Sequence, residues 1–250
     1  MTTAETPAVE LRHLTKSFGT RRVLDDVNLV VPKGRAVCIL GRSGTGKSVA
    51  LKHIIGLMRP DSGSVLVEGE DITRLNRREL SRVRQRIGLL FQNAALFDSI
   101  SVGENVAFPL RRHSRLSDAE IRERAEHLLA QVRLAREYDK MPADLSGGMR
   151  KRAGLARALA LEPAIVLADE PSAGLDPVTA AEIDQLLVEL NDRAGTTLIV
   201  VTHNIPSARV IGDELVFLHE GRIIAQGSAD ALDESTVPLV RQFMRSEGAG

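Results

Sequence analysis

A glycine-rich segment between an apolar run and a helical pattern constrains the fold of this chain more than any other feature. Residues 41–48 read Gly-Arg-Ser-Gly-Thr-Gly-Lys-Ser and follow the apolar run 37–40. Glycines at this spacing let backbone N–H groups close around phosphates, and the following helix presents its positive N-terminal end. We therefore predict a phosphate-binding loop between a buried strand and a helix. The residues assigned to it are Gly41, Arg42, Ser43, Gly44, Thr45, Gly46, Lys47, Ser48 and Val49.

The last two positions of this pattern predict the ligands. In P-loop nucleotide hydrolases the lysine reaches the β- and γ-phosphates, and the following hydroxyl holds Mg²⁺. We assign these roles to Lys47 and Ser48, so ATP and Mg²⁺ are the expected ligands. Alone, the motif indicates only this broad class.

Two adjacent carboxylates end another apolar run. Residues 165–168 read Ile-Val-Leu-Ala and are followed by Asp169 and Glu170. A carboxylate at the end of a strand holds Mg²⁺ in P-loop enzymes, and a neighbouring one can act as general base on water. We predict that Asp169 binds the metal and that Glu170 activates the attacking water.

Short apolar runs separated by helical patterns predict an α/β fold. Runs of this length suit strands buried on both faces, so we expect a mostly parallel sheet flanked by helices. The predicted strands are 37–40, 87–91, 165–168, 197–201 and 215–218. Strands at 9–11 and 27–31, around a polar turn at 19–22, predict an N-terminal antiparallel sheet, and 222–225 should pair with 215–218 as a hairpin.

The chain between the second and third predicted strands is mostly helical in pattern. Ser117 and Glu120 form a capping-box pattern ahead of a regular amphipathic segment. Asp176 and Pro177 mark the start of a second amphipathic helix. We predict one domain over 1–250 that contains a helical subdomain at about 93–160 and a short C-terminal tail at 228–250. The apolar positions expected on the two helices are Ile121, Ala125, Leu128, Leu129 and Val132, then Ile183, Leu186, Leu187 and Leu190.

Composition excludes several classes of protein. Lys plus Arg equals Asp plus Glu at 33 each, which argues against a nucleic-acid partner. The single cysteine, Cys38, rules out a disulfide framework within the chain. No run approaches the roughly 20 apolar residues of a membrane span, and the N-terminus lacks a signal-peptide pattern. We expect a cytoplasmic protein that serves a membrane only by docking to other subunits.

A signature upstream of the carboxylates indicates the family. Residues 145–149, Leu-Ser-Gly-Gly-Met, resemble the LSGGQ signature of ATP-binding cassette (ABC) proteins, and the resemblance extends from about residue 9 to residue 226. It implies a RecA-like core and a head-to-tail dimer, in which Ser146, Gly147 and Gly148 contact the γ-phosphate bound by the other copy. The further residues that match family elements are Phe18, Gln92, Asp176 and His203.

Each of these matches implies a role. Phe18 resembles the aromatic residue that stacks on adenine. A phenylalanine of the hydrophobic core beside a strand would give the same sequence pattern. Gln92 resembles the glutamine that senses Mg²⁺ and attacking water, and His203 the switch histidine on the γ-phosphate. Asp176 ends the segment Ser-Ala-Gly-Leu-Asp and is grouped with the nucleotide-binding residues.

Met149 narrows the resemblance to one subfamily, because glutamine is the commoner residue at this position of the ABC signature. The run Leu-Ser-Gly-Gly-Met-Arg-Lys-Arg is similar to the ATPases of Mla/Mce-type lipid transport systems, as are residues 91–99, 105–110 and 240–243. The resemblance implies integral-membrane permease subunits as partners, with a membrane-anchored lipid-binding protein as a further one. The chain would then lie on the inner face of the cell membrane.

Other functions of ABC ATPases are alternatives to this one. A chromosome or DNA-repair ATPase needs long coiled-coil arms, and the segment between Gln92 and Ser146 is too short for them. Ribosome-associated members carry two cassettes in one chain. A transporter for another substrate, such as an amino acid or a metal complex, stays open because the permease contacts the substrate.

Overall fold

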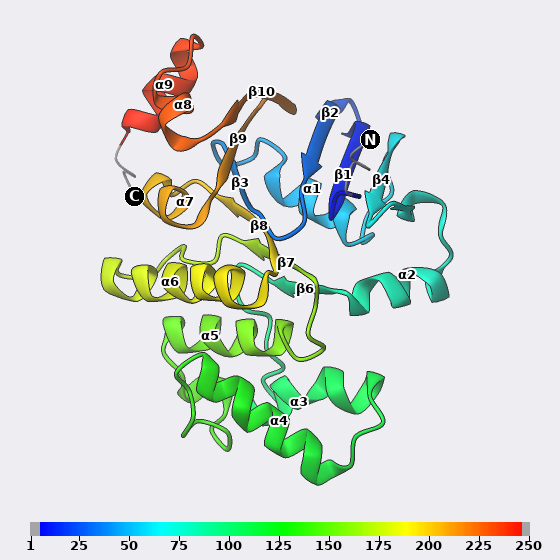
Figure 1. The fold of residues 1–250 in the computed structure, drawn as a ribbon, viewed down its shortest axis with the longest axis vertical. Helices are drawn as coiled ribbons and strands as arrows, with labels where there is room; N and C mark the ends of the chain where they lie inside the picture. The colour runs from blue at the N-terminus through cyan, green and yellow to red at the C-terminus, as the bar shows by residue number, and fades with distance from the viewer. Residues whose placement is uncertain (1–5, 247–250) are drawn as a thin grey trace, which may run out of the picture.

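A six-stranded sheet forms the centre of the computed structural model, which describes residues 6–246 (Figure 1). Residues 1–5 of the predicted domain and 247–250 of the predicted tail lie outside that range. The strand order is β10-β9-β3-β8-β7-β6, parallel except for β10. The strands are β3 (Ala36–Leu40), β6 (Ile87–Leu90), β7 (Ile165–Asp169), β8 (Thr197–Thr202), β9 (Glu214–His219) and β10 (Arg222–Gly227).

Burial on both faces explains why these runs form strands. Every residue of β3 and β8 is buried, as expected for parallel strands covered on two sides. The predicted strands and the β9–β10 hairpin are confirmed. The predicted end of the strand at residue 91 is wrong, because Phe91 lies beyond β6 and is exposed. The other strands of this sheet extend one or two residues past their predicted bounds.

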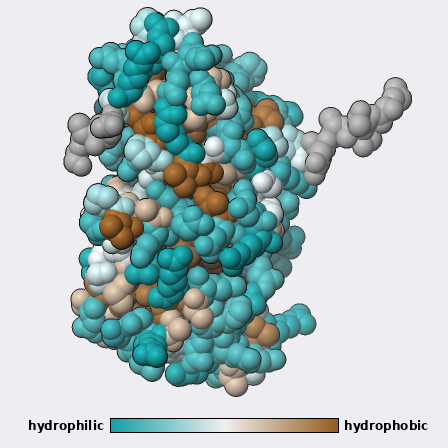
Figure 2. Space-filling model, turned by 60° about the vertical axis from the view of Figure 1, so that its left-hand side comes forward, coloured by the Kyte–Doolittle hydropathy of each residue, from teal (hydrophilic) through white to brown (hydrophobic). Residues whose placement is uncertain are grey.

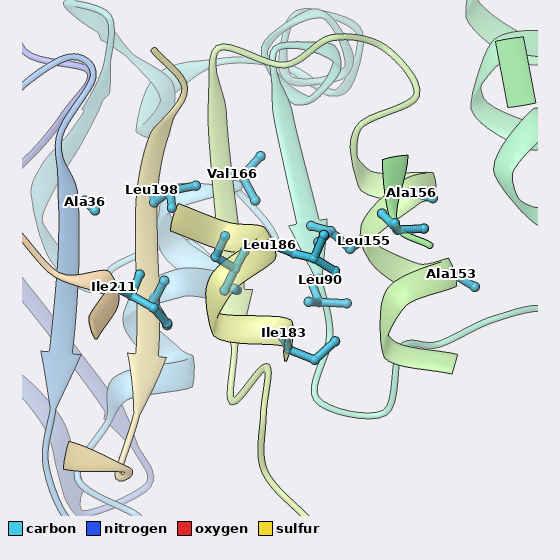
Figure 3. Packing of buried hydrophobic residues seen from close by; sticks show 14 of the residues in the cluster. Ala36, Leu90, Ala153, Leu155, Ala156, Val166, Ile183, Leu186, Leu198 and Ile211 are labelled. Carbon is cyan, nitrogen blue, oxygen red and sulfur yellow. The ribbon is translucent and has the colours of Figure 1, made fainter. Parts of the chain in front are cut away.

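The sheet separates two hydrophobic cores. Along β3, Cys38 and Leu40 face one core, whereas Val37 and Ile39 face the other, which follows from the two-residue period of a strand. The first core joins the sheet to the packed helices, and Figure 3 shows Leu155 and Leu186 among its residues. The second core lies under the antiparallel sheet and α1 (Lys47–Ile54).

The predicted N-terminal antiparallel sheet is confirmed, and it is larger than expected. Its first two strands run further than the predicted 9–11 and 27–31, so residues 21–22 of the predicted turn belong to the second strand. It has the order β2-β1-β4-β5. The strands are β1 (Val9–Phe18), β2 (Arg21–Val31), β4 (Ser62–Val67) and β5 (Glu70–Asp71). The last two lack a strong alternating pattern, which is why they were not predicted.

Helices cover the central sheet, and three of them continue away from it at the foot of Figure 1. These three are α3 (Val102–His113), α4 (Asp118–Gln131) and α5 (Gly147–Ala158). The Ser117 capping box predicted at the start of α4 is present. The other helical elements are η1 (Ile72–Arg74), α2 (Arg77–Gln85), η2 (Pro142–Asp144), α6 (Pro177–Ala194), α7 (Ile205–Ile211), α8 (Ala229–Asp233) and α9 (Pro238–Arg245).

The last two helices pack onto the main sheet. The Phe243 ring of α9 meets the Phe217 ring of β9 edge-on, with their centroids 4.7 Å apart. Val240 and Met244 are buried in the first core.

Apolar patches interrupt the mostly hydrophilic face seen in Figure 2. No helix within residues 6–246 has the length and apolar character needed to cross a membrane.

Candidate nucleotide-binding site

The loop between β3 and α1 depends on glycine at two positions. Gly46 precedes α1 with φ 106°, a left-handed conformation that favours glycine. A Cβ atom there would lie 2.7 Å from the Val23 carbonyl oxygen, and one at Gly41 would lie 2.3 Å from the Leu218 carbonyl oxygen. The neighbouring β2 and β9 strands therefore leave room for backbone only. Such a loop turns its N–H groups into a concave surface suited to phosphate oxygens.

Side chains fix the shape of this loop. Thr45 Oγ1 donates a hydrogen bond to the Arg42 carbonyl oxygen at 2.9 Å, across the turn. From β2, the Arg21 guanidinium donates to the Gly44 carbonyl oxygen at 3.1 Å. Arg42, Ser43 and Gly44 are exposed. The antiparallel sheet thus holds the tip of the loop in place.

Lys47 lies under the loop with its ammonium group almost fully buried. Its Nζ donates to the carbonyl oxygens of Gly41 and Arg42 at 2.7 and 3.1 Å. The same atom lies 3.8 Å from Glu170 Oε1. Burial lowers the pKa of Lys47, and the nearby carboxylates of Glu170 and Asp169 oppose that change. The two hydrogen bonds therefore hold the Lys47 amine in one position beside the loop.

Ser48 and Asp169 are joined across the sheet edge. The Ser48 hydroxyl donates to Asp169 Oδ1 at 2.9 Å. Burial raises the pKa of Asp169, and the Ser48 hydrogen bond lowers it. Among the described residues no group of three or more His, Cys, Asp or Glu side chains could hold a metal. A hydroxyl and one carboxylate suit Mg²⁺, which takes few protein ligands and completes its shell with phosphate and water.

Glu170 has an unusual backbone conformation. Its φ is 50°, uncommon for a residue with a side chain and often found where a functional group is aimed. Two contacts hold it there. Its N–H donates to the Val201 carbonyl oxygen at 2.8 Å, and the buried Lys151 Nζ donates to its carbonyl oxygen at 2.8 Å. The side chain is buried beside the P-loop lysine.

His203 reaches the same carboxylate from the end of β8. Its Nδ1 lies 2.9 Å from Glu170 Oε1, and its backbone N–H donates to Oε2 at 3.4 Å. The imidazole is about half exposed, at 53% of its side-chain area. Asn204 then caps α7 by accepting a hydrogen bond from the Ser207 N–H. The carboxylate therefore lies between a buried ammonium group and an accessible imidazole.

Ser146 and the two glycines that follow it begin a different helix. Ser146 Oγ accepts a hydrogen bond from the Met149 N–H at 3.3 Å, so the serine caps α5. A Cβ atom at Gly148 would lie 2.2 Å from the Thr179 methyl carbon on α6, and one at Gly147 would lie 3.4 Å from Leu175. The glycines thus allow the N-terminal ends of α5 and α6 to meet.

The remaining predicted residues lie around these two groups. The Asp176 carboxylate caps α6 by accepting from the N–H groups of Val178 and Thr179, and the bond to Thr179 lowers its pKa. Gln92 is exposed and lines a pocket of about 440 Å³ together with Gly147. Phe18 is 46% exposed at the end of β1.

The structure therefore connects only some of the predicted site residues. The P-loop, Asp169, Glu170 and His203 form one hydrogen-bonded and ion-paired group. Within residues 6–246, no hydrogen bond joins that group to the side chains of Phe18, Gln92, Ser146 or Asp176.

Sequence reasoning missed two residues that shape the site. Arg21 supports the tip of the loop, and Lys151 holds the Glu170 backbone. Burial lowers the pKa of Lys151, as it does for Lys47. Lys151 lies one turn into the signature helix within a basic run, so its pattern in the sequence is that of a solvated helix. Only the folded structure, in which Lys151 Nζ reaches the Glu170 carbonyl oxygen just after β7, distinguishes it.

The fold and the loop define a P-loop nucleotide-binding protein. Residues 24–173 match the ABC transporter family. The chain is 45% identical over 97% of its length to the probable ribonucleotide transport ATP-binding protein mkl of Mycobacterium tuberculosis, covering 68% of that protein. It is 41% identical over 94% of its length to the intermembrane phospholipid transport system ATP-binding protein MlaF of Escherichia coli K12, covering 88% of it.

Solved structures agree with these matches. The dimeric, ADP- and phosphate-bound ATP-binding cassette MJ0796 superimposes with a TM-score of 0.83 and 37% identity, over 88% of this chain and 98% of that one. The chain belongs to the ABC transporter family, as an ATP-binding and ATP-hydrolysing subunit. The predicted family and fold class are confirmed.

Proposed function

We propose that this ATPase energises lipid transport at the inner face of a cell membrane, and that its catalytic centre is the group around Glu170. The observation that supports the centre is the convergence of Lys47, Ser48, Asp169 and His203 on one end of the sheet. In this proposal Lys47 and the loop N–H groups bind the β- and γ-phosphates. Ser48 and Asp169 would hold Mg²⁺, which neutralises phosphate charge when bound.

Glu170 is proposed as the general base. Its carboxylate is buried, lies next to the proposed metal ligand Asp169 in sequence, and is aimed by a strained backbone. His203, 2.9 Å away, orients this carboxylate and offers its other ring nitrogen to the γ-phosphate. Gln92 is proposed to contact Mg²⁺ and the attacking water, and Phe18 to stack on adenine.

A second copy of the chain is proposed to complete each site. Ser146 begins α5, so the positive end of that helix is free to meet an anion. No hydrogen bond connects it to the P-loop of its own chain within the described residues. A head-to-tail dimer would bring Ser146, Gly147, Gly148 and Asp176 of one copy to the nucleotide of the other. The dimeric MJ0796 cassette supports this arrangement.

The permease is proposed to dock in an apolar groove between α2 and α3. Phe91, Phe97 and Phe108 line it and are 38–45% exposed, which is unusual for large aromatic residues on a free surface. The groove holds about 420 Å³, which suits the apolar face of a short helix. The groove is lined by residues of β6 as well as of the helices α2, α3 and α5. A partner bound in it would therefore contact both the sheet that carries the ATP site and the helices beside it.

Lipid as the cargo is supported by the similarity to MlaF over nearly the whole of both chains. A membrane-anchored lipid-binding protein would then be a further partner. The relative mkl, at 45% identity, favours ribonucleotide as a second candidate cargo. The nucleotide site binds the energy source, so it does not discriminate between the two.

Two measurements test the proposal. Lys47→Ala should abolish ATP turnover, because no backbone group replaces the lysine charge. The purified variant should stay folded; turnover at the parent rate would reject the site.

Affinity purification of the tagged chain from membranes should recover a polytopic permease together with phospholipid and a lipid-binding subunit. Recovery of a nucleotide- or amino-acid-binding receptor instead would reject lipid as the cargo.

A further inference from the structure

Five arginines near the apolar groove have no acidic partner. All are exposed on α2 or near the C-terminal end of α3. Within residues 6–246 none of their side chains makes an ion pair or hydrogen bond, whereas their neighbours Arg74, Arg86 and Arg111 are ion-paired. The unpaired set, here called the basic rim, is Arg77, Arg78, Arg82, Arg112 and Arg115.

The rim arginines of α2 are kept on its exposed side by the packing of the helix. Leu80 and Val83 are buried and fix the inner face of the helix. Arg78 and Arg82, four residues apart, therefore share the opposite face, where like charges repel. The one acidic side chain of α2, Glu79, accepts a hydrogen bond from the Asn76 N–H at 2.8 Å in the helix cap. It does not pair with the arginines, so their charge faces solvent.

The groove beside the rim is also free of negative charge. No Asp or Glu lines it, and its charged or titratable lining residues are Arg84, Arg157 and His113. The two helices that carry the rim, α2 and α3, both lie on the right of Figure 1 and line the two sides of the groove. The chain as a whole has equal numbers of acidic and basic residues, so this concentration is local.

We propose that the basic rim binds the phosphate headgroups of anionic lipids on the membrane surface next to the permease. The inference rests on the proposed function, which places the groove at the permease. The five rim arginines do not line the groove, so a helix seated in it leaves them uncovered. Guanidinium groups bind phosphate in a bidentate manner, and a basic cluster is attracted to an anionic leaflet within a Debye length.

Such contacts would orient the ATPase. The uneven charge gives one preferred face toward an anionic membrane, and it is the face that carries the groove. Binding to lipid would therefore raise the local concentration of the chain near its permease with the correct side forward.

Vesicle binding of the purified full chain tests this inference. Parent protein should co-sediment with phosphatidylcholine vesicles that contain phosphatidylglycerol, much less with phosphatidylcholine alone, and less at high salt. The triple variant R77Q/R78Q/R82Q should lose about 10–100-fold in apparent affinity, because each arginine near an anionic surface contributes to attraction. The matched control K33Q/R136Q/R245Q removes the same charge from exposed residues with no ion pair among the described residues, and it should bind like the parent.

Three outcomes would overturn the inference: no difference between the two lipid compositions, equal loss in both triple variants, or salt-sensitive binding to the detergent-solubilised permease without vesicle binding. The last would assign the rim to an acidic protein surface. ATP turnover of the same preparations without vesicles tests the proposed catalytic function separately. Normal turnover with failed vesicle binding rejects only the role of the basic rim.

Discussion

His203 Nδ1 lies 2.9 Å from Glu170 Oε1, and the same carboxylate oxygen lies 3.8 Å from the buried Lys47 Nζ. One carboxylate therefore contacts both the residue proposed to bind phosphate and the residue proposed to sense it. A buried carboxylate needs partners, and here an ammonium group and an imidazole face it. Its backbone is fixed by Lys151 and by the Val201 carbonyl oxygen.

Glu170→Gln should slow ATP hydrolysis by about 10²–10⁴-fold, the usual contribution of a positioned general base. Glutamine keeps the shape of the side chain, so the affinity for ATP should change little. Removal of the negative charge that faces the γ-phosphate should also prolong any ATP-bound dimer. Single-turnover kinetics and size-exclusion chromatography with ATP and Mg²⁺ measure the two effects.

Glu162→Gln is the matched control, because Glu162 also has a positive φ but is exposed. It should hydrolyse ATP like the parent. Full activity of Glu170→Gln would mean that another group activates the water.

Asp184 gives a prediction about stability and pH. The side chain lies on α6 and is 5% exposed, and its Oδ1 has no hydrogen-bond partner among the described residues. Burial raises the pKa of Asp184 above its ordinary value of 3.8, and the Ser207 and Ser172 hydroxyls partly oppose that change. The unfolded chain thus releases this proton at lower pH than the folded chain does, so stability falls as pH rises between the two pKa values.

Asp184→Asn removes this titration. The free energy of unfolding of the variant relative to the parent should therefore increase as pH rises from near 3.8. The increase should be about 1.4 kcal/mol for each pH unit that separates the folded and unfolded pKa values, and constant above the folded pKa. Urea denaturation at a series of pH values measures it. Asp192→Asn changes an exposed carboxylate on the same helix as a control; equal pH profiles for both variants would contradict the burial argument.

The central fold was predictable because its strands are buried on both faces. An uninterrupted apolar run such as 197–201 has few alternatives, and β8 was placed almost to its last residue. The β4 and β5 strands escaped prediction for the opposite reason. β4 is half exposed and begins with Ser-Gly-Ser, and it is a strand because β1 pairs with it.

The site was predictable where its chemistry depends on adjacent residues. The local sequence pattern predicts both adjacent pairs, Lys47 with Ser48 and Asp169 with Glu170. The roles of these residues are proposals. Lys151 and Arg21 could not be found in this way, because each acts on a backbone carbonyl that is distant in sequence. Every residue has a backbone carbonyl oxygen, so the partner position carries no characteristic residue type that a sequence pattern could show.

Gly46→Ala tests the close approach of β2 to the P-loop. The substitution forces a side chain into φ 106° and puts its Cβ 2.7 Å from the Val23 carbonyl oxygen. Gly19→Ala is the control, because Gly19 has φ 59° and a Cβ atom added there would meet no other atom within 4 Å. The left-handed conformation alone costs about 1–2 kcal/mol, so Gly19→Ala should lose that amount. Gly46→Ala should lose more and should also weaken ATP binding, as thermal unfolding and nucleotide titration would show; equal losses would exclude the clash.

Ser146→Arg tests whether each site needs two copies of the chain. Arginine at the start of α5 adds bulk and positive charge where the other copy's phosphate would lie, but it does not touch the P-loop of its own chain. ATP binding should therefore persist while hydrolysis is lost. Loss of the serine cap costs about 1 kcal/mol as well. Ser228→Arg removes the comparable cap of α8, away from the site, and should remain active.

Mixing Ser146→Arg with Lys47→Ala separates a composite site from two independent ones. In a mixed dimer, one site combines the intact P-loop of the Ser146→Arg chain with the intact Ser146 of the Lys47→Ala chain, and the other site carries both defects. Since half of the chains in an exchanged mixture form such dimers, turnover should reach about a quarter of the parent rate if each site acts alone. Neither variant should turn over by itself. Subunit exchange, followed by fluorescence transfer between labelled chains, must be shown in the same sample. An inactive mixture with proven exchange would contradict independently acting composite sites.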